Sequence, residues 1–365
     1  MSRVLIAGGG TAGHVVPALA LADVLSSRGD EVAFCGTERG MEKELIPEAG
    51  YPFSVVRIRG FDRELGVSTL RTLGSLPVAA IDAWKLLSAL RPGCVVGVGA
   101  YASGPVVAEA ALRGIPTVAV EMDSYMGWTN RILSLMVDKV CLAFPNPDRT
   151  GAKYVYTGRP LRPALLKVTR EEGQARFGLA PDRPVLLVFG GSLGAHSLNE
   201  ATVAAFARAR TPFQIVHVSG ERDYPRISGL LEEPGANPAY QAFPFLEDFP
   251  KALAAADAVV ARSGGSVAEV LARGIPSLLV PYPRAAGDHQ TKNARVVAQE
   301  GAALLVADAD LDRDSLSRAV ETLLNPEVNR RMRAAALRLA RPNAASSIAE
   351  VIVELVAASS RRNHD

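Results

Sequence analysis

The sequence predicts an α/β protein made of two Rossmann-like domains, each a doubly wound parallel sheet covered by helices. Short, continuous apolar runs alternate with helical patterns along the chain, which is typical of parallel strands buried on both faces. A glycine-rich segment that follows an apolar run and opens a helical pattern occurs twice, at residues 8–14 and 190–196. A length of 365 residues exceeds what one hydrophobic core usually supports, so two domains are expected.

The apolar runs mark the expected strands in chain order. They are residues 4–7, 32–35, 95–98, 117–120, 185–189, 215–218, 258–261 and 277–280. Turn formers and two prolines interrupt any regular element in residues 157–163, so the domain boundary is expected there. We assign residues 1–160 to an N-terminal domain, 161–341 to a C-terminal domain and 342–365 to a final helix that follows the break at Arg341-Pro342-Asn343.

Composition and cysteine spacing limit the function classes. A formal net charge of +2, from 40 basic and 38 acidic residues, gives no sign of a nucleic-acid partner. Cys35, Cys94 and Cys141 are odd in number and widely spaced, which indicates a reducing cytoplasm rather than a disulfide framework or a metal site. The first apolar run begins at Val4, which leaves no room for a signal peptide. No apolar stretch approaches the roughly 20 residues that span a bilayer, so any membrane contact is expected to be peripheral.

The first glycine-rich segment leaves several functions open. Gly8, Gly10 and Gly13 form a G-x-G-x-x-G pattern after a strand, where backbone N–H groups can approach a diphosphate at a helix N-terminus. The pattern would also suit an NAD-dependent dehydrogenase, with Glu38 as the acidic residue after the second strand. It would equally suit a tight turn that binds nothing.

The neighbouring residues add a resemblance to a known family. Residues 8–14, followed by Val15-Val16-Pro17-Ala18, resemble the signature of the MurG family, which belongs to glycosyltransferase family 28. Four further segments resemble motifs of that family, in the family's order and at similar spacing; they are residues 36–42, 97–105, 190–195 and 289–294. The resemblance covers most of the chain. It implies a GT-B fold, in which two Rossmann-like domains face a central cleft and the last helix crosses back to the first domain.

The resemblance also implies an activity. Members of the family are inverting N-acetylglucosaminyltransferases that move GlcNAc from UDP-GlcNAc to the muramyl C4 hydroxyl of undecaprenyl-diphosphate-MurNAc-peptide, converting lipid I to lipid II. The reaction belongs to peptidoglycan synthesis, and through it to cell division and cell shape. It takes place at the cytoplasmic face of the cell membrane, with the enzyme bound peripherally to the anionic surface. The family implies no cofactor and no metal.

The acceptor side is expected around the first glycine-rich segment. His14 could cap or pack the helix, or its imidazole could take a proton from an attacking hydroxyl or bind an acceptor phosphate. The resemblance favours the last two roles and makes His14 the expected catalytic residue. It places acceptor and diphosphate binding at Gly10, Thr11, Gly13, His14, Tyr101, Ser103, Glu121 and Asp123.

Residues 121–124 differ from the sequence common in the family. A related transferase that acts on another lipid phosphate or on a natural product therefore stays open. So do a UDP-sugar epimerase and a catalytically silent sugar-nucleotide sensor, since fold alone does not decide between them.

The donor side is expected in the C-terminal domain. The resemblance assigns the ribose hydroxyls of UDP to Glu269, whose carboxylate can accept two hydrogen bonds. Gln290 and Asn293 lie three residues apart, hence on one helix face, and their amides suit the hydroxyls of a hexose. The complete expected donor set is Arg162, Gly191, Ser192, Gly264, Gly265, Ser266, Glu269, His289, Gln290 and Asn293.

Asp308-Ala309-Asp310 matches the D-x-D pattern of metal-dependent glycosyltransferases of another fold. These aspartates follow an apolar run and precede a helical pattern. We therefore expect Asp308 and Asp310 to cap the helix and complement its dipole, and we expect no metal.

An apolar segment with basic residues, 70–91, has two possible roles. It could be a helix buried against the sheet. The resemblance adds membrane docking, for which apolar side chains and a basic rim are both needed. The expected membrane patch is Leu73, Leu76, Ile81, Trp84 and Lys85.

Overall fold

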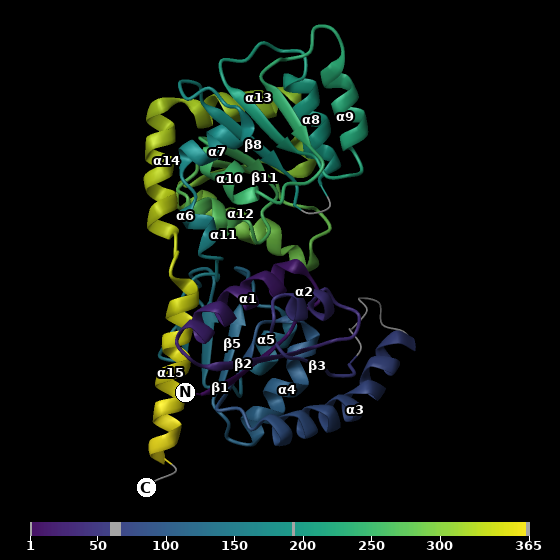
Figure 1. Ribbon diagram of the computed structural model, residues 1–365, viewed down its shortest axis with the longest axis vertical. Helices are drawn as coiled ribbons and strands as arrows, with labels where there is room; N and C mark the ends of the chain where they lie inside the picture. The colour runs from purple at the N-terminus through teal and green to yellow at the C-terminus, as the bar shows by residue number, and fades with distance from the viewer. Residues whose placement is uncertain (1, 59–66, 192–193, 363–365) are drawn as a thin grey trace. The chain divides into compact units, whose positions relative to one another are not determined.

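The computed structural model describes residues 2–58, 67–191 and 194–362, with the backbone alone described at 67–74 and 362. The chain divides into two compact units. Unit 1 comprises Met1–Arg162 and Arg341–Asp365, and unit 2 comprises Pro163–Ala340. The boundaries expected from the sequence were 160/161 and 341/342. Each unit contains a parallel sheet with helices packed on it (Figure 1).

Unit 1 contains a seven-stranded parallel sheet in the order β3-β2-β1-β4-β5-β6-β7. Its strands are β1 Arg3–Ala7, β2 Glu31–Gly36, β3 Phe53–Val55, β4 Cys94–Gly97, β5 Thr117–Glu121, β6 Lys139–Leu142 and β7 Tyr154–Tyr156. Its helices are α1 Ala12–Ser27, α2 Glu42–Glu48, α3 Val67–Leu90, α4 Ala100–Leu112, α5 Trp128–Leu133 and α15 Ala344–Arg362.

Strand β1 shows why the apolar runs are continuous. Val4 and Ile6 pack into one core cluster with α1 and α15, whereas Leu5 and Ala7 pack into another with α3 and α4. Successive side chains of a strand point to opposite faces, so a strand covered on both faces must be apolar at every position.

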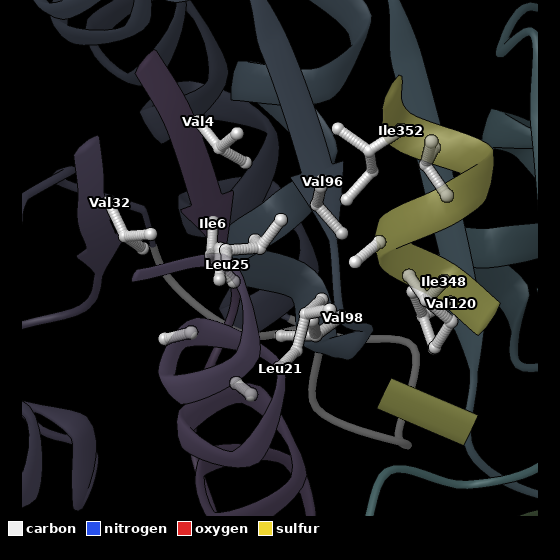
Figure 2. Close-up of a cluster of buried hydrophobic side chains, with 14 of the residues drawn as sticks. Val4, Ile6, Leu21, Leu25, Val32, Val96, Val98, Val120, Ile348 and Ile352 are labelled. Carbon is white, nitrogen blue, oxygen red and sulfur yellow. The ribbon is translucent and has the colours of Figure 1, made fainter. Parts of the chain in front are cut away.

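Helix α15 completes the core of unit 1. Figure 2 shows Ile348 and Ile352 of α15 beside Val96 and Val120 of the sheet, and all four side chains are buried. Burying one such side chain contributes about 1.5–3 kcal/mol relative to exposure, so the last helix is an integral part of this unit.

Unit 2 contains a six-stranded parallel sheet in the order β10-β9-β8-β11-β12-β13. Its strands are β8 Val185–Phe189, β9 Gln214–Val218, β10 Tyr240–Phe243, β11 Ala258–Ala261, β12 Ser277–Leu279 and β13 Ala303–Leu305. Its α-helices are α6 Ala164–Lys167, α7 Arg170–Phe177, α8 His196–Phe206, α9 Tyr224–Glu232, α10 Phe249–Ala255, α11 Val267–Ala272, α12 His289–Gln299, α13 Arg313–Leu324 and α14 Pro326–Leu339. Two 3-10 turns, η1 Ala286–Asp288 and η2 Asp308–Asp310, precede α12 and α13.

All eight apolar runs named from the sequence are strands, each within one residue of its expected bounds. Strand β13 is the apolar run that precedes Asp308, and strands β3, β6, β7 and β10 were not anticipated. Three of these lie at sheet edges, and their residues are mostly half-buried, so they lack the continuous apolar pattern of central strands.

The three cysteines are free and buried in strands of unit 1. Burial raises the pKa of the Cys35 thiol to about 12, so it stays protonated at neutral pH. Among the described helices, none combines the length and apolar character that crossing a bilayer requires.

A buried polar chain crosses the core of unit 2. The His217 ring lies 2.7 Å through Nδ1 from the Tyr240 hydroxyl and 2.9 Å through Nε2 from Asn199 Oδ1. The Asn199 amide donates to Asp223 at 2.7 Å, so its oxygen faces the imidazole. This network assigns the proton of neutral His217 to Nε2.

His217 makes the stability of unit 2 sensitive to acid. Burial lowers the pKa of His217 to about 3, against about 6.5 for an exposed histidine. Because the folded pKa is the lower one, the unfolded chain binds the extra proton between these values. The stabilising contribution is present above pH 6.5 and is lost below it, by at most about 1.4 kcal/mol per pH unit. We expect calorimetric melting between pH 7.5 and 5 to show a steeper fall in Tm for the wild type than for His217→Gln. Equal slopes would contradict this assignment.

Candidate functional site

The predicted site residues gather at the carboxyl ends of central strands. In unit 1 the strand order reverses between β1 and β4, and in unit 2 it reverses between β8 and β11. Loops diverge at such a reversal and leave a crevice at the sheet edge, where open α/β sheets bind ligands. The loops after β1, β4 and β5 carry the expected acceptor residues. Those after β8 and β11 carry five of the ten expected donor residues.

The first glycine-rich loop is shaped by close backbone contacts. Gly8, Gly9 and Gly10 all have positive φ, which favours glycine. A Cβ added to Gly8 would lie 2.6 Å from Val98 Cγ2 and 2.8 Å from the Gly99 carbonyl oxygen. The loop after β1 therefore packs directly on the segment that follows β4.

The other side of this loop is held by Glu42, a residue that sequence reasoning missed. Its carboxylate is fully buried, and Oε2 accepts a hydrogen bond from the Gly10 backbone N–H at 2.6 Å. Its other oxygen accepts from Thr37. Glu42 lies in the motif at residues 36–42, but the motif gave no indication of this partner.

His14 lies in the first turn of α1, half-buried, and its ring faces the loop after β4. Its Nδ1 is 3.3 Å from the Thr11 hydroxyl, and Thr11 is the N-cap residue of α1. A Cβ on Gly99 would lie 3.0 Å from His14 Cδ2 and 3.1 Å from Nε2. Only a glycine at position 99 lets the imidazole lie this close to the backbone.

Arg159 is a second residue that sequence reasoning missed. Its buried guanidinium donates through Nη2 to the Gly13 carbonyl and through Nη1, at 3.0 Å, to the Met122 carbonyl. In a regular helix the Gly13 carbonyl would accept from the N–H of residue 17, but Pro17 has none. Pro17 thus frees the carbonyl that Arg159 binds. A proline five residues into a helix was the available signal.

The loop after β5 is organised around Glu121. The carboxylate is buried and accepts from the backbone N–H groups of Asp123 and Gly127, at 3.1 Å each, and from the Asn130 amide at 3.0 Å. Burial raises the pKa of the Glu121 carboxyl. Glu121 therefore shapes its own loop from inside, while Asp123 is half-buried on it.

The two candidates in α4 differ in exposure. Tyr101 is half-buried, whereas Ser103 is fully buried and its hydroxyl donates to the Ala100 carbonyl at 2.9 Å. Ser103 is thus engaged in the helix start. Ala100, the first residue of α4, has a φ of 61°, an unusual value for a residue other than glycine.

The second glycine-rich loop begins unit 2's site. Gly191 is exposed with positive φ, and Gly194 lies against the loop after β9, where a Cβ would strike the Ser219 carbonyl. Ser192, predicted to bind the donor, lies outside the described residues.

The loop after β11 is joined to the start of α12. The Ser263 hydroxyl donates to the Gln290 carbonyl at 2.8 Å, and the buried Asn293 amide donates to the Ser263 carbonyl at 3.1 Å. The Gln290 side-chain oxygen accepts from the Tyr282 N–H at 2.9 Å, which turns its amide nitrogen toward Gly264. Gln290, Asn293 and Gly264 are therefore brought together, with Asn293 holding the loop.

The remaining described donor candidates are half-buried, except for the exposed Arg162. Gly265 and Ser266 continue the loop after β11, and Glu269 is half-buried in the first turn of α11. His289 begins α12, with Nδ1 2.8 Å from the Ala286 carbonyl. Arg162 is exposed and belongs to unit 1.

The expected role of the D-x-D aspartates was wrong. The N-cap of α13 is Asp312, whose carboxylate accepts from the Ser315 N–H at 2.7 Å. Asp308 instead accepts from Arg262 at 2.5 Å and from the Ser197 hydroxyl at 2.6 Å. The buried guanidinium of Arg262 requires an anion, and Asp308 supplies it.

The described residues contain no group of three His, Cys, Asp or Glu side chains arranged to hold a metal.

Comparisons with known proteins agree along the whole chain. The model of the glycosyltransferase family 28 N-terminal domain matches residues 4–142, and that of the C-terminal domain matches residues 185–352. The chain is 37% identical over 363 residues to a UDP-N-acetylglucosamine--N-acetylmuramyl-(pentapeptide) pyrophosphoryl-undecaprenol N-acetylglucosamine transferase of Halothermothrix orenii, with 96% of this chain and 98% of the relative covered.

Solved structures show the same similarity. The crystal structure of Acinetobacter baumannii MurG matches with a TM-score of 0.82 at 31% identity, over 97% of this chain and 100% of that one. A UDP-GlcNAc 2-epimerase from Neisseria meningitidis matches with a TM-score of 0.68 at 16% identity, over 96% of this chain and 100% of that one, and shows likeness of fold alone. The predicted fold class, a GT-B chain of two Rossmann-like units, is confirmed.

The backbone at Ala100 yields a stability prediction. A left-handed conformation costs an L-residue about 1–2 kcal/mol, partly offset by the greater freedom of glycine in the unfolded chain. Ala100→Gly should therefore raise the free energy of unfolding by about 0.5–1 kcal/mol. Ala108→Gly, in the middle of the same helix, should lower it by about 1 kcal/mol. Denaturant titrations of both variants measure the two values, and a loss of stability in both would show that Ala100 is not strained.

Proposed function

The chain belongs to glycosyltransferase family 28, and on that premise we propose that it is the transferase that converts lipid I to lipid II in peptidoglycan synthesis. In this reaction GlcNAc passes from UDP-GlcNAc to the C4 hydroxyl of a muramyl peptide linked to undecaprenyl diphosphate. The observation that carries the proposal is the similarity to relatives named for this reaction, over nearly the full length of both chains.

Two alternatives have less support. The epimerase likeness rests on fold at low identity, whereas the transferase likeness includes both family 28 domains. A dehydrogenase would bind its diphosphate on the N–H groups of the first glycine loop. Neither the family 28 domains nor the named relatives support such a use. Relatives named for the muramyl acceptor also argue against another lipid or natural-product acceptor.

We assign the donor to unit 2. The Glu269 carboxylate accepts hydrogen bonds from the ribose hydroxyls, and Gln290 reads the hexose, while the buried Asn293 holds the loop beside it. The N-terminus of α8, with Gly191 and Ser192 before it, neutralises the diphosphate as UDP departs. The supporting observation is the network that joins the Ser263–Gly264 loop to the start of α12.

We assign the acceptor and the base to unit 1. The acceptor hydroxyl attacks the anomeric carbon as the bond to UDP breaks, so the configuration inverts. His14 removes the hydroxyl proton, and we assign this transfer to Nε2 because Nδ1 faces Thr11. Helix and loop N–H groups around Thr11 and Gly13 bind the acceptor diphosphate. Dipoles and His14 serve here without a metal or another cofactor.

We also propose that unit 1 docks peripherally on the cytoplasmic face of the membrane through α3. The helix is amphipathic: Ala79, Ala83 and Leu87 are buried, whereas Ile81 and Trp84 are 53% and 56% exposed. Leu76 and Lys85 are exposed on α3 as well, and the Leu73 side chain lies outside the described residues. Lys85 is the basic neighbour on this surface, because the Arg113 guanidinium that stacks on the Trp84 ring at 5.5 Å is paired with Glu109 at 2.8 Å. Apolar side chains with basic neighbours suit an anionic leaflet, not a nucleic acid.

The transfer reaction tests the proposed function. Incubated with UDP-GlcNAc and a short-chain lipid I analogue, the protein should yield the disaccharide and one UDP per transfer. His14→Ala should lower turnover by about 10²-fold, the usual contribution of a positioned base, with little change in donor affinity. Release of UDP-ManNAc without acceptor would identify an epimerase instead, and normal turnover by His14→Ala would exclude His14 as the base.

The docking surface predicts a split between two activities. Ile81→Ser with Trp84→Ser should reduce binding to anionic vesicles while transfer to a short, soluble acceptor continues. Each basic group near the leaflet contributes about 1 kcal/mol, which salt screens, so wild-type binding should weaken with salt without vanishing.

The matched control replaces two exposed apolar side chains elsewhere, Phe245→Ser with Val353→Ser. It should bind vesicles like the wild type. If the α3 variant sediments normally with vesicles, the docking surface lies elsewhere.

A further inference from the structure

One buried charge has no part in the proposed reaction. Glu42 begins α2 and is 0% exposed, so its carboxylate has no contact with solvent. A buried carboxylate is costly unless hydrogen bonds compensate it. Oε2 accepts from the Gly10 N–H at 2.6 Å, while Oε1 accepts from the Thr37 N–H at 2.9 Å and the Thr37 hydroxyl at 2.8 Å. Three donors on two oxygens make this a well-satisfied anion.

Glycines surround this carboxylate. A Cβ on Gly36 would lie 2.7 Å from Glu42 Cγ, and a Cβ on Gly9 or Gly40 would overlap the carboxylate itself. Side chains at these three positions would expel Glu42 from its place. The motif at residues 36–42 is thus explained as a socket for one carboxylate.

The carboxylate sets the position of the first glycine loop. Gly10 is the last loop residue before Thr11, the N-cap of α1, and Thr11 in turn contacts His14. The opposite side of the loop rests on Val98 and Gly99. Without the bond from Gly10 to Glu42, glycines at positive φ would have many other conformations available.

The same bond determines where an anion can bind. The Gly10 N–H donates to Glu42, and a second anion placed there would meet the negative charge of the carboxylate. A bound diphosphate is therefore directed beyond Gly10, to the start of α1, where His14 lies.

We propose that Glu42 is a positioning residue: its carboxylate holds Gly10 so that the start of α1 accepts the acceptor diphosphate and His14 faces the reacting hydroxyl. This inference rests on the proposed function for its catalytic consequence. The hydrogen bond by which Glu42 holds Gly10 does not depend on that function.

The test uses Glu42→Gln. A glutamine keeps one acceptor oxygen, and its NH₂ must face a donor. The side with a single donor is Gly10, so Thr37 keeps its bonds and the loop is released. We expect kcat with the short-chain lipid I analogue to fall by about tenfold or more, because the charged hydrogen bond that aligns the loop is lost. UDP-GlcNAc affinity, measured by calorimetry, should stay within about twofold of the wild type.

Thr37→Val is the matched control. It removes the hydroxyl donor from the same carboxylate but leaves the Gly10 bond in place, so it should cost stability without reducing kcat. Hydrogen exchange of the amides in residues 8–14 should become faster in Glu42→Gln and not in Thr37→Val. Hydrogen exchange needs no substrate, so it tests the hydrogen bond between Gly10 and Glu42 even if the wild type transfers no GlcNAc. An absence of transfer would contradict the proposed function but not this hydrogen bond.

Two results would overturn the proposal. One is unchanged kcat and unchanged exchange in folded Glu42→Gln. The other is an equal loss of kcat in both variants at equal stability, which would make Glu42 merely structural. If Glu42→Gln fails to fold, kcat and hydrogen exchange are measured instead on Glu42→Asp, which shortens the side chain by one methylene. The same two results would then overturn the proposal.

Discussion

The reversal of strand order within each sheet is the constraint on which the rest of the structure depends. It separates the loops after β1 and β4 in unit 1, and those after β8 and β11 in unit 2, so side chains and backbone dipoles can converge there. A strand order without this reversal would cover the same edge with packed connections. Both sheets have this reversal, and the two units differ in the side chains that lie at the sheet edge.

In unit 1 the edge is built largely from buried ions that bind backbone groups. Glu42 takes an N–H of the glycine loop, Arg159 takes a carbonyl that Pro17 leaves unpaired, and Glu121 gathers the N–H groups of its own loop. Charged hydrogen bonds to backbone are stronger than neutral ones, so they fix the conformation of these loops. Unit 2 combines both kinds of contact: the buried Arg262 donates to the Val280 and Pro281 carbonyls, and neutral hydrogen bonds join Ser263, Gln290 and Asn293.

Much of this could be predicted from the sequence, because central strands and glycine loops carry local patterns. Short edge strands such as β3 and β7 carry no such pattern, because most of their residues are half-buried and show no hydrophobic period. Glu42 and Arg159 were missed because their partners lie 32 and 146 residues away. Asp308 was assigned wrongly for the same reason. The local pattern suits a helix cap, but the cap is Asp312, and the partner of Asp308 is 46 residues distant.

The place of α15 in the core of unit 1 has a consequence for how the protein is made. Unit 2 is one uninterrupted stretch of chain, whereas unit 1 is assembled from a first segment and a last one. Domains generally fold as they leave the ribosome. The core around Val96 and Val120 stays open until Ile348 and Ile352 have been synthesised, after all of unit 2. Unit 2 can therefore finish folding while part of the apolar core of unit 1 is still exposed to solvent. Chaperones bind exposed apolar surface of this kind.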